Sequence, residues 1–214
     1  MTRIRTALFG LLLVLSACGP QIYKSNPLAS AVQQHKTVAI LPAEVTMRLR
    51  PNEMKNMSQG SMTNLQERTG LDIQDRMYSW LLRRSDRFHY SVSFQDINKT
   101  NSLLRDAGIT AATLASQDRK ELARILGVDA VMQNRSYMDK PMSDGAALAV
   151  GVLFGAWTST NAVQTTINIH DGSSGSLLWK YDYEAQGSVG SNAESLVNGL
   201  MRNATKHFPY KEKS

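Results

Sequence analysis

The sequence holds one thiol, and its position indicates covalent attachment rather than catalysis. Cys18 is the only cysteine among 214 residues, so no disulfide can form within the chain. It follows two basic residues, Arg3 and Arg5, and an almost wholly apolar run from Ala7 to Leu15. A charged start, a short apolar stretch and small residues before a cut site are the layout of a secretory signal peptide. The apolar run is shorter than the roughly 20 residues that span a bilayer. We therefore predict that residues 1–17 are removed.

The residues at this junction resemble the lipobox of bacterial lipoproteins: Leu15, Ser16, Ala17 and Cys18. The resemblance implies that the Cys18 thiol takes a diacylglycerol, that the signal is cut before it, and that the new amino terminus is acylated. Several acyl chains make attachment stable, whereas one chain binds only marginally. Position 19, directly after the cysteine, is Gly and not Asp. By the sorting rule of enterobacterial lipoproteins this implies the periplasmic face of the outer membrane, with the inner membrane as the alternative. The competing interpretation is an ordinary signal with a chance cysteine after the cut.

The rest of the sequence shows no motif of an enzyme or a metal site. It has no Gly-x-Ser-x-Gly nucleophile elbow and no Walker phosphate loop. Asp171 falls in a predicted turn, where its carboxylate can bond local backbone, and Asp182 and Glu184 share one strand face, where solvation is expected. The histidines lack metal-ligand spacing and are expected at the surface or at strand ends: His35, His89, His170 and His207. We predict no enzymatic activity, no metal and no cofactor.

Length and charge bound the remaining choices. Without its signal the chain has 197 residues, which suits one domain with a real core. The net charge of +6 includes +2 from Arg3 and Arg5, which leaves +4 on the mature side chains. An exported protein meets little nucleic acid, so none is expected as a partner. The net positive charge indicates anionic lipid headgroups or envelope polymers as partners, or simply a solvated surface.

Periodicity predicts the elements of the amino-terminal half. Residues 18–35 are expected as a lipidated tether, because Pro20 and Pro27 disfavour regular structure. A β-rich run over 36–42 predicts a buried strand, and residues 44–59 are polar and irregular. Apolar positions at three- and four-residue spacing predict a helix from about Gly60 to Arg84, with Gly70 as a place to bend.

The carboxyl-terminal half predicts strands and helices in turn. Alternation over 87–93 predicts a strand, and a helix is expected over 94–107. A second helix, with Ser116 as its N-cap, is expected to end at Gly127, and a strand follows over 128–138. Alternation over 163–170 and 177–184 around an Asp-Gly turn predicts a hairpin. Its stripe of Trp179, Tyr181 and Tyr183 is expected in the core, with a peptide- or glycan-binding face as the alternative. Ser191 and Glu194 have capping-box spacing and begin a last helix. The predicted fold is an α/β (α+β) sandwich, a mixed sheet of about five strands with helices packed against it, over 36–208, followed by a polar tail over 209–214.

Three stretches resemble a known family in their order and spacing: Thr37 to Pro42, Leu126 to Val131, and Asp171 to Gly175 leading into Leu177, Leu178 and Trp179. Behind a lipobox, they resemble envelope lipoproteins with a domain like the curli-secretion lipoprotein CsgG and the amino-terminal domain of TolB. The resemblance covers roughly 36–206. It implies that fold and a non-enzymatic role in envelope assembly, secretion or regulation, and it transfers no site residue beyond Cys18.

A run of 13 uncharged residues, 145–157, departs from that pattern. It is too short to span a membrane as a helix, which leaves an interfacial segment, a subunit contact or a core helix. Gly151 and Gly155 have the spacing of helix contacts in membranes. The expected contact residues are Leu148, Val150, Val152, Leu153, Phe154 and Trp157. No long alternating strand pair accompanies the run, which argues against a β-barrel pore.

These observations predict a lipid-anchored envelope protein that acts by binding another envelope protein or copies of itself. The first alternative is a subunit of an oligomeric secretion or export channel. The second is an envelope hydrolase, which would need a nucleophile and a base brought together by the fold.

Overall fold

The computed structural model describes residues 21–48, 55, 57–139, 162–186 and 193–212. Within them the chain forms one mixed sheet in the order β1-β7-β6-β5-β2-β4, and β3 also pairs with β5. The seven strands are β1 Gln21–Lys24, β2 Thr37–Ile40, β3 Glu44–Arg48, β4 Ser93–Phe94, β5 Ala130–Asp139, β6 Ala162–Asp171 and β7 Leu177–Gln186. The α/β class and the mixed sheet are confirmed. The strands β1 and β3 were not expected, and of the strand expected over 87–93 only Ser93 lies in a strand, β4.

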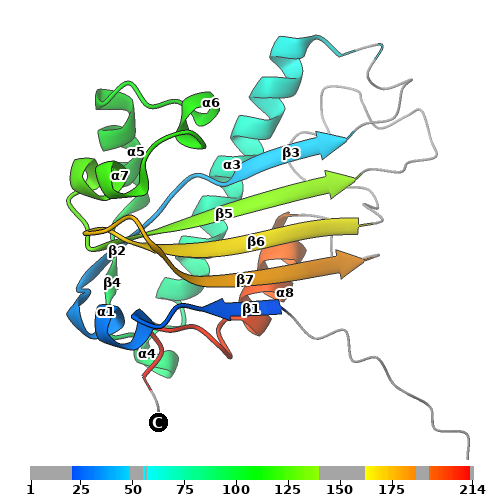
Figure 1. The fold of residues 1–214 in the computed structure, drawn as a ribbon. Coiled ribbons are helices and arrows are strands. Elements are labelled where there is room, and N and C mark those ends of the chain that lie inside the picture. The colour runs from blue at the N-terminus through cyan, green and yellow to red at the C-terminus, as the bar shows by residue number, and fades with distance from the viewer. Residues whose placement is uncertain (1–20, 49–54, 56, 140–161, 187–192, 213–214) are drawn as a thin grey trace, which may run out of the picture.

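Helices lie on both faces of this sheet (Figure 1). They are α1 Leu28–Gln34, α3 Gln59–Leu82, α4 Ser85–Phe88, α5 Ile97–Asp106, α6 Ala111–Leu114, α7 Arg119–Leu126 and α8 Ala193–Ala204. The long helix α3 and α8 cover one face, where the larger apolar core forms. The three helices α5, α6 and α7 cover only part of the other face, over β2 and the start of β5, where a smaller core forms. The rest of that second face has no helix of the described chain over it.

The strand β2 is buried on both sides, as its continuous apolar run predicts. Val38 and Ile40 belong to the larger core, and Ala39 and Leu41 belong to the smaller one. The last helix and the hairpin also form where expected. One side of α8 is buried: Leu196, Val197, Leu200, Met201 and Ala204.

The backbone of α3 comes very close to the segment that joins β2 to β3, and Gly70 makes this approach possible. An ideal Cβ at Gly70 would lie 2.2 Å from the carbonyl oxygen of Ala43. The Ala43 amide donates to the Gly70 carbonyl at 3.1 Å. Gly70 was expected as a place to bend, but the structure gives it the different role of letting two backbones touch.

Two expected irregular segments are ordered, so those predictions are wrong. The proposed tether contains β1 and α1, because β1 finds pairing partners on β7, where Ile22 lies beside Tyr181. The polar tail contains Tyr210, whose side chain is fully buried. The folded part of the chain therefore extends beyond 36–208 at both ends.

The strand expected over 87–93 is also wrong, because aromatic packing overrides local alternation. Residues 85–88 form α4, and His89 adopts a left-handed conformation with φ of 45°. This reversal places Phe88 against Trp80, with 5.9 Å between ring centroids, and Tyr90 against Phe208 at the same separation.

A smaller correction concerns the start of α7. Its N-cap is Asp118 and not Ser116, since the Asp118 carboxylate accepts a hydrogen bond from the Glu121 amide at 2.9 Å.

Candidate functional site

The residues expected to carry function all lie outside the described part of the chain. They are Leu15, Ser16, Ala17, Cys18, Leu148, Val150, Val152, Leu153, Phe154 and Trp157. The described strands nevertheless show where both segments attach to the fold. Gln21 is the first residue of the sheet after Cys18, and Asp139 and Ala162 flank the segment that carries the 145–157 run.

Asp139 and Ala162 lie at one end of the sheet, which we call the anchor end, and Gln21 lies four residues of β7 short of it. Asp139 pairs with Ala162, and Ala162 pairs with Gln186. Gln21 pairs with Asp182, four residues before the end of β7, and β1 runs away from that end. Figure 1 shows β6 beginning where β3, β5 and β7 finish, and the start of β1 set back from that end. Only three peptide units separate Gln21 from Cys18, a reach of about 10 Å. A lipid on Cys18 would therefore hold the anchor end close to the bilayer.

The uncovered half of the second sheet face forms a broad polar surface, which we call the open face. Residues directly opposite each other on paired strands share a face. The register therefore groups the side chains into three rows: Tyr23, Lys180, Asn168 and Gln133; Gln21, Asp182, Thr166, Arg135 and Glu44; and Glu184, Gln164, Tyr137 and Thr46. The neighbours of these residues along each strand point the other way, into the larger core.

Charges on the open face are paired across and along the strands. Glu44 binds the guanidinium of Arg135, with 3.0 Å from Nε to Oε2, and accepts a hydrogen bond from the Gln133 amide. Asp182 pairs with the Lys180 ammonium at 2.9 Å and accepts from the Thr166 hydroxyl at 2.6 Å. Glu44 also lies 3.8 Å from the guanidinium of Arg119 on α7. Both carboxylates thus have a cation beside them, so a partner can cover the face without leaving either carboxylate alone.

Two tyrosines stand out on this surface. Tyr23, on edge strand β1, is 50 % exposed, and Tyr137, on β5, is 39 % exposed. Tyrosine and arginine are enriched in protein interfaces, where they often dominate the binding free energy. The exposed guanidinium of Arg135 lies in the row between those of the two tyrosines. The open face therefore presents the exposed side chains of both tyrosines and of Arg135.

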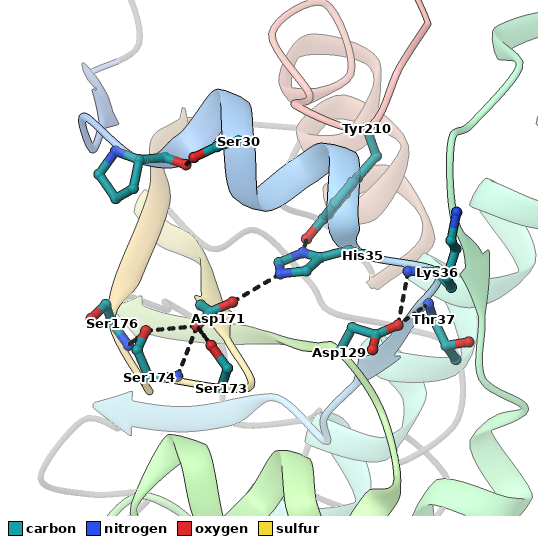
Figure 2. Close-up of polar contacts among 11 residues, drawn as sticks. Ser30, His35, Lys36, Thr37, Asp129, Asp171, Ser173, Ser174, Ser176 and Tyr210 are labelled. Atoms are coloured by element: carbon teal, nitrogen blue, oxygen red, sulfur yellow. Dashed lines mark hydrogen bonds and ion pairs between the residues drawn. The ribbon is translucent and has the colours of Figure 1, made fainter.

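A second polar group, the His35 cluster, lies at the end of the sheet away from the anchor (Figure 2). It consists of His35, Asp129, Asp171 and Tyr210. His35 is 4 % exposed, and its Nε2 lies 2.9 Å from Asp171 Oδ1 while its Nδ1 lies 2.7 Å from the Tyr210 hydroxyl. Asp129 Oδ2 accepts from the backbone amides of Lys36 and Thr37 at 2.8 and 2.9 Å. The cluster thus joins the start of β2 to the hairpin turn and to the carboxyl-terminal segment.

The ionisation of Asp171 fixes the direction of these hydrogen bonds. Burial works to raise the pKa of Asp171, but hydrogen bonds from Ser173, Ser174 and His35 outweigh it and hold that pKa well below its usual range. A carboxylate only accepts, so His35 donates through Nε2. In the neutral ring, Nδ1 then accepts from the hydroxyl of Tyr210, whose pKa is raised by burial.

A histidine between a carboxylate and a hydroxyl resembles the arrangement of a hydrolase triad, but this one has no accessible nucleophile. The hydroxyl belongs to Tyr210, which has no exposed surface. The nearby Ser173 and Ser174 hydroxyls bond to Asp171 and not to the imidazole. We interpret the His35 cluster as a structural tie between distant parts of the chain.

We predict that Asp171 makes stability depend on pH. Because its pKa is lower in the folded than in the unfolded chain, its contribution is complete above about pH 4 and is lost as the pH falls below that value. Replacing Asp171 with Asn should lower the free energy of unfolding by about 1–3 kcal/mol at pH 7. The deficit should shrink between pH 4 and pH 3. Urea unfolding across this range measures it, with exposed Asp106→Asn as the control. A deficit that stays constant with pH would contradict the assignment.

The remaining expectations about single residues divide as follows. The histidines were expected at the surface or at strand ends. His35 is buried, so a surface place is wrong for it, and it lies two residues before β2. His89 and His207 are exposed, and His170 lies half-buried at a strand end. Trp179 and Tyr181 are fully buried and Tyr183 packs against them, which confirms the aromatic stripe as core. Among the described residues, no three His, Cys, Asp or Glu side chains are arranged to hold a metal ion.

The open face and the His35 cluster were both missed from the sequence. Alternation does mark one polar side of each strand, so the polar face of the hairpin could have been found. That no described helix covers it, and that His35 meets Tyr210 across 175 positions, follows only from the tertiary fold. Within the described residues, no helix is both long and apolar enough to cross a membrane.

No family model and no curated protein matches this sequence. Solved structures match it with low sequence identity. Lipoprotein GNA1162 from Neisseria meningitidis is 15 % identical over 80 % of this chain and 94 % of its own, with a TM-score of 0.46. The PelC dodecamer from Paraburkholderia phytofirmans is 12 % identical over 91 % and 98 %, with a TM-score of 0.44. The LpoB carboxyl-terminal domain from Salmonella enterica is 10 % identical over 75 % and 93 %, with a TM-score of 0.36. Likeness this distant assigns no site, and the narrower resemblance to CsgG and TolB stays a prediction.

Proposed function

We propose that this chain is a lipid-anchored envelope protein that binds a protein partner through the open face, as an assembly or regulatory component of an envelope machine. The observation that carries the proposal is the open face itself, a surface of paired charges with two exposed tyrosines and no described helix over it. Lipidation at Cys18 and a periplasmic position at the outer membrane remain part of the proposal. They would place this face beside the membrane, because β1 forms its edge.

The 145–157 run fits the same arrangement. Asp139 and Ala162, the described residues on either side of the segment that carries the run, lie at the anchor end, which is the side where the lipid would be. This supports a membrane or subunit contact for Leu148, Phe154 and Trp157 over a place in the core. An export-channel subunit is the second candidate function, since the same geometry would bring such runs together in a ring.

The test begins with photo-crosslinking in cells that make the full chain. A photoreactive amino acid at position 23 or 137 should give a discrete protein adduct. The same residue at Leu71 or Leu82, which are exposed on α3 away from the open face, should give none. Adducts of equal yield from all four positions, or none from 23 and 137, would contradict binding through this face. An adduct of twice the chain's mass would identify a second copy as the partner.

We predict that Tyr23→Ala combined with Tyr137→Ala weakens binding to the identified partner at least thirtyfold. Each tyrosine that is buried at an interface centre is worth about 1–2 kcal/mol or more, and each 1.4 kcal/mol is tenfold in affinity. Both side chains are exposed in the free protein, so the thermal unfolding midpoint should stay nearly constant. Titration by calorimetry or surface plasmon resonance measures the change, with Leu71→Ala and Leu82→Ala together as the matched control.

A further inference from the structure

A hollow of about 390 Å³ lies at the anchor end, between the finish of β3 and the start of α3. Its walls include Met47, Met57 and Met62, with Tyr137, Ser58 and Arg48 beside them. Met47, Met57 and Met62 are ten and five positions apart in the sequence, and the fold gathers them around one space. All three are partly buried, whereas Arg48 is exposed at the rim.

The position of the hollow relates it to the proposed membrane surface. β1 and β3 lie at opposite edges of this part of the sheet, with β7, β6 and β5 between them. Four strand spacings separate them, which is about 19 Å. The hollow, the end of β5 and the start of β6 therefore lie along the same end of the sheet, and the start of β1 is set back from it by four residues of β7. A bilayer that lies against this end would meet the hollow.

The side chains around the hollow suit a ligand that is an amphiphilic anion. Methionine side chains are flexible and polarisable, and they adapt to an irregular apolar ligand. The Arg48 guanidinium matches phosphate oxygens with paired donors. The 24-residue helix α3 begins here at Gln59, after the Ser58 cap, and the amino-terminal end of its dipole favours negative charge. None of the described residues lining the hollow carries a carboxylate. The volume is near the lower limit of ligand pockets, so it accepts part of one chain and not a whole lipid.

We propose that this hollow holds part of an anionic phospholipid from the anchoring leaflet. Arg48 and the start of α3 face the phosphate, and Met47, Met57 and Met62 contact the first part of an acyl chain. The inference rests on the proposed function, because it takes the anchor end to be the membrane side. It adds a lipid contact that is independent of Cys18 and that orients the sheet upright on the bilayer.

The experiment uses the full chain purified from membranes in mild detergent and reconstituted into vesicles. The vesicles contain phosphatidylcholine and 30 % phosphatidylglycerol, a fraction of which carries a diazirine in one acyl chain. Flotation first shows whether the protein is attached to the vesicles. Illumination and peptide mass spectrometry then locate the labelled residues. We expect labels on Met47, Met57 or Met62, and at least a fivefold loss of these labels in Arg48→Glu and in Met62→Ser.

Matched controls come from the far end of the molecule. Arg87→Glu makes the same charge change on α4, and Leu82→Ser removes an exposed apolar side chain at the other end of α3. Both should retain the labels. Replacing photoactivatable phosphatidylglycerol with phosphatidylcholine should reduce labelling about as much as Arg48→Glu does.

The outcomes separate this inference from the proposed function. Protein that floats with the vesicles but carries no label in the hollow overturns the lipid site and leaves membrane attachment intact. A hollow filled by residues of the same chain or by a protein partner would give that result. Labels that Arg48→Glu and Met62→Ser leave unchanged also overturn the site, since labelling would then be non-specific. Protein that does not float contradicts the proposed attachment itself.

Discussion

Replacing Gly70 by alanine is expected to lower the free energy of unfolding by about 3 kcal/mol or more. In an ordinary helix interior, replacing glycine by alanine raises the free energy of unfolding by about 1 kcal/mol, because alanine has a higher helix propensity than glycine. The reversal follows from one contact. The new Cβ would lie 2.2 Å from the Ala43 carbonyl oxygen, and that oxygen belongs to the backbone and cannot rotate away.

The loss should be large because α3 carries much of the core. Moving the helix outward to relieve the contact would stretch the 3.1 Å hydrogen bond from Ala43 to Gly70 and loosen Ile73 and Met77, both fully buried. Overpacking of this kind usually costs 1–3 kcal/mol, and forced movement of a whole helix adds to it. Urea unfolding followed by circular dichroism measures the change.

Gly60→Ala is the matched control within the same helix. An ideal Cβ at Gly60 meets nothing closer than the Ser58 hydroxyl at 4.0 Å, so this variant should be as stable as the natural protein or slightly more stable. Equal stability of Gly70→Ala and Gly60→Ala would show that α3 does not press against the β2 to β3 connection.

Removing the thiol of Cys18 is expected to abolish lipidation and with it stable attachment to membranes. The comparison needs two variants, because Cys18→Ser prevents acylation but can also leave the signal uncut. In the second, residues 1–18 are replaced by an ordinary secretory signal, so that the mature chain begins at Gly19. Each buried methylene of an acyl chain contributes about 0.8 kcal/mol to membrane binding, so the loss of several chains is decisive.

The readouts are incorporation of labelled palmitate, the mass of the mature amino-terminal peptide, and fractionation after a high-salt wash. The natural chain should take up label at Cys18 and stay with the membranes, and the Gly19 form should move to the periplasmic fraction. A Gly19 form that stays bound after the wash would show that another segment, such as 145–157, suffices for attachment. Cleavage at a site other than before Cys18 would remove the lipobox interpretation.

Short edge strands show why part of the fold escaped prediction. β1 has four residues and β3 has five, too few for a pattern to be distinguished from an irregular segment. Each forms because a longer strand beside it supplies hydrogen-bond partners, β7 for β1 and β5 for β3. The strand expected over 87–93 failed for the converse reason. Its alternation was real, but Phe88 lies in α4, Tyr90 forms only an isolated bridge with Lys211, and the two rings pack against each other.

The sequence alone determined those features that arise from neighbours along the chain. Periodicity located α3, α7 and α8, alternation located the hairpin, and the apolar run located β2, because each pattern reflects burial on one face or both. The lipobox resemblance likewise depends on adjacent residues. The tertiary structure decided everything that depends on distant ones. It brought His35 to Asp171 and Tyr210 and gathered three methionines around one hollow. It also left half a sheet face without a described helix over it, and it placed Asp139 and Ala162 at one end. Such juxtapositions depend on strand order and register, which a local pattern does not contain.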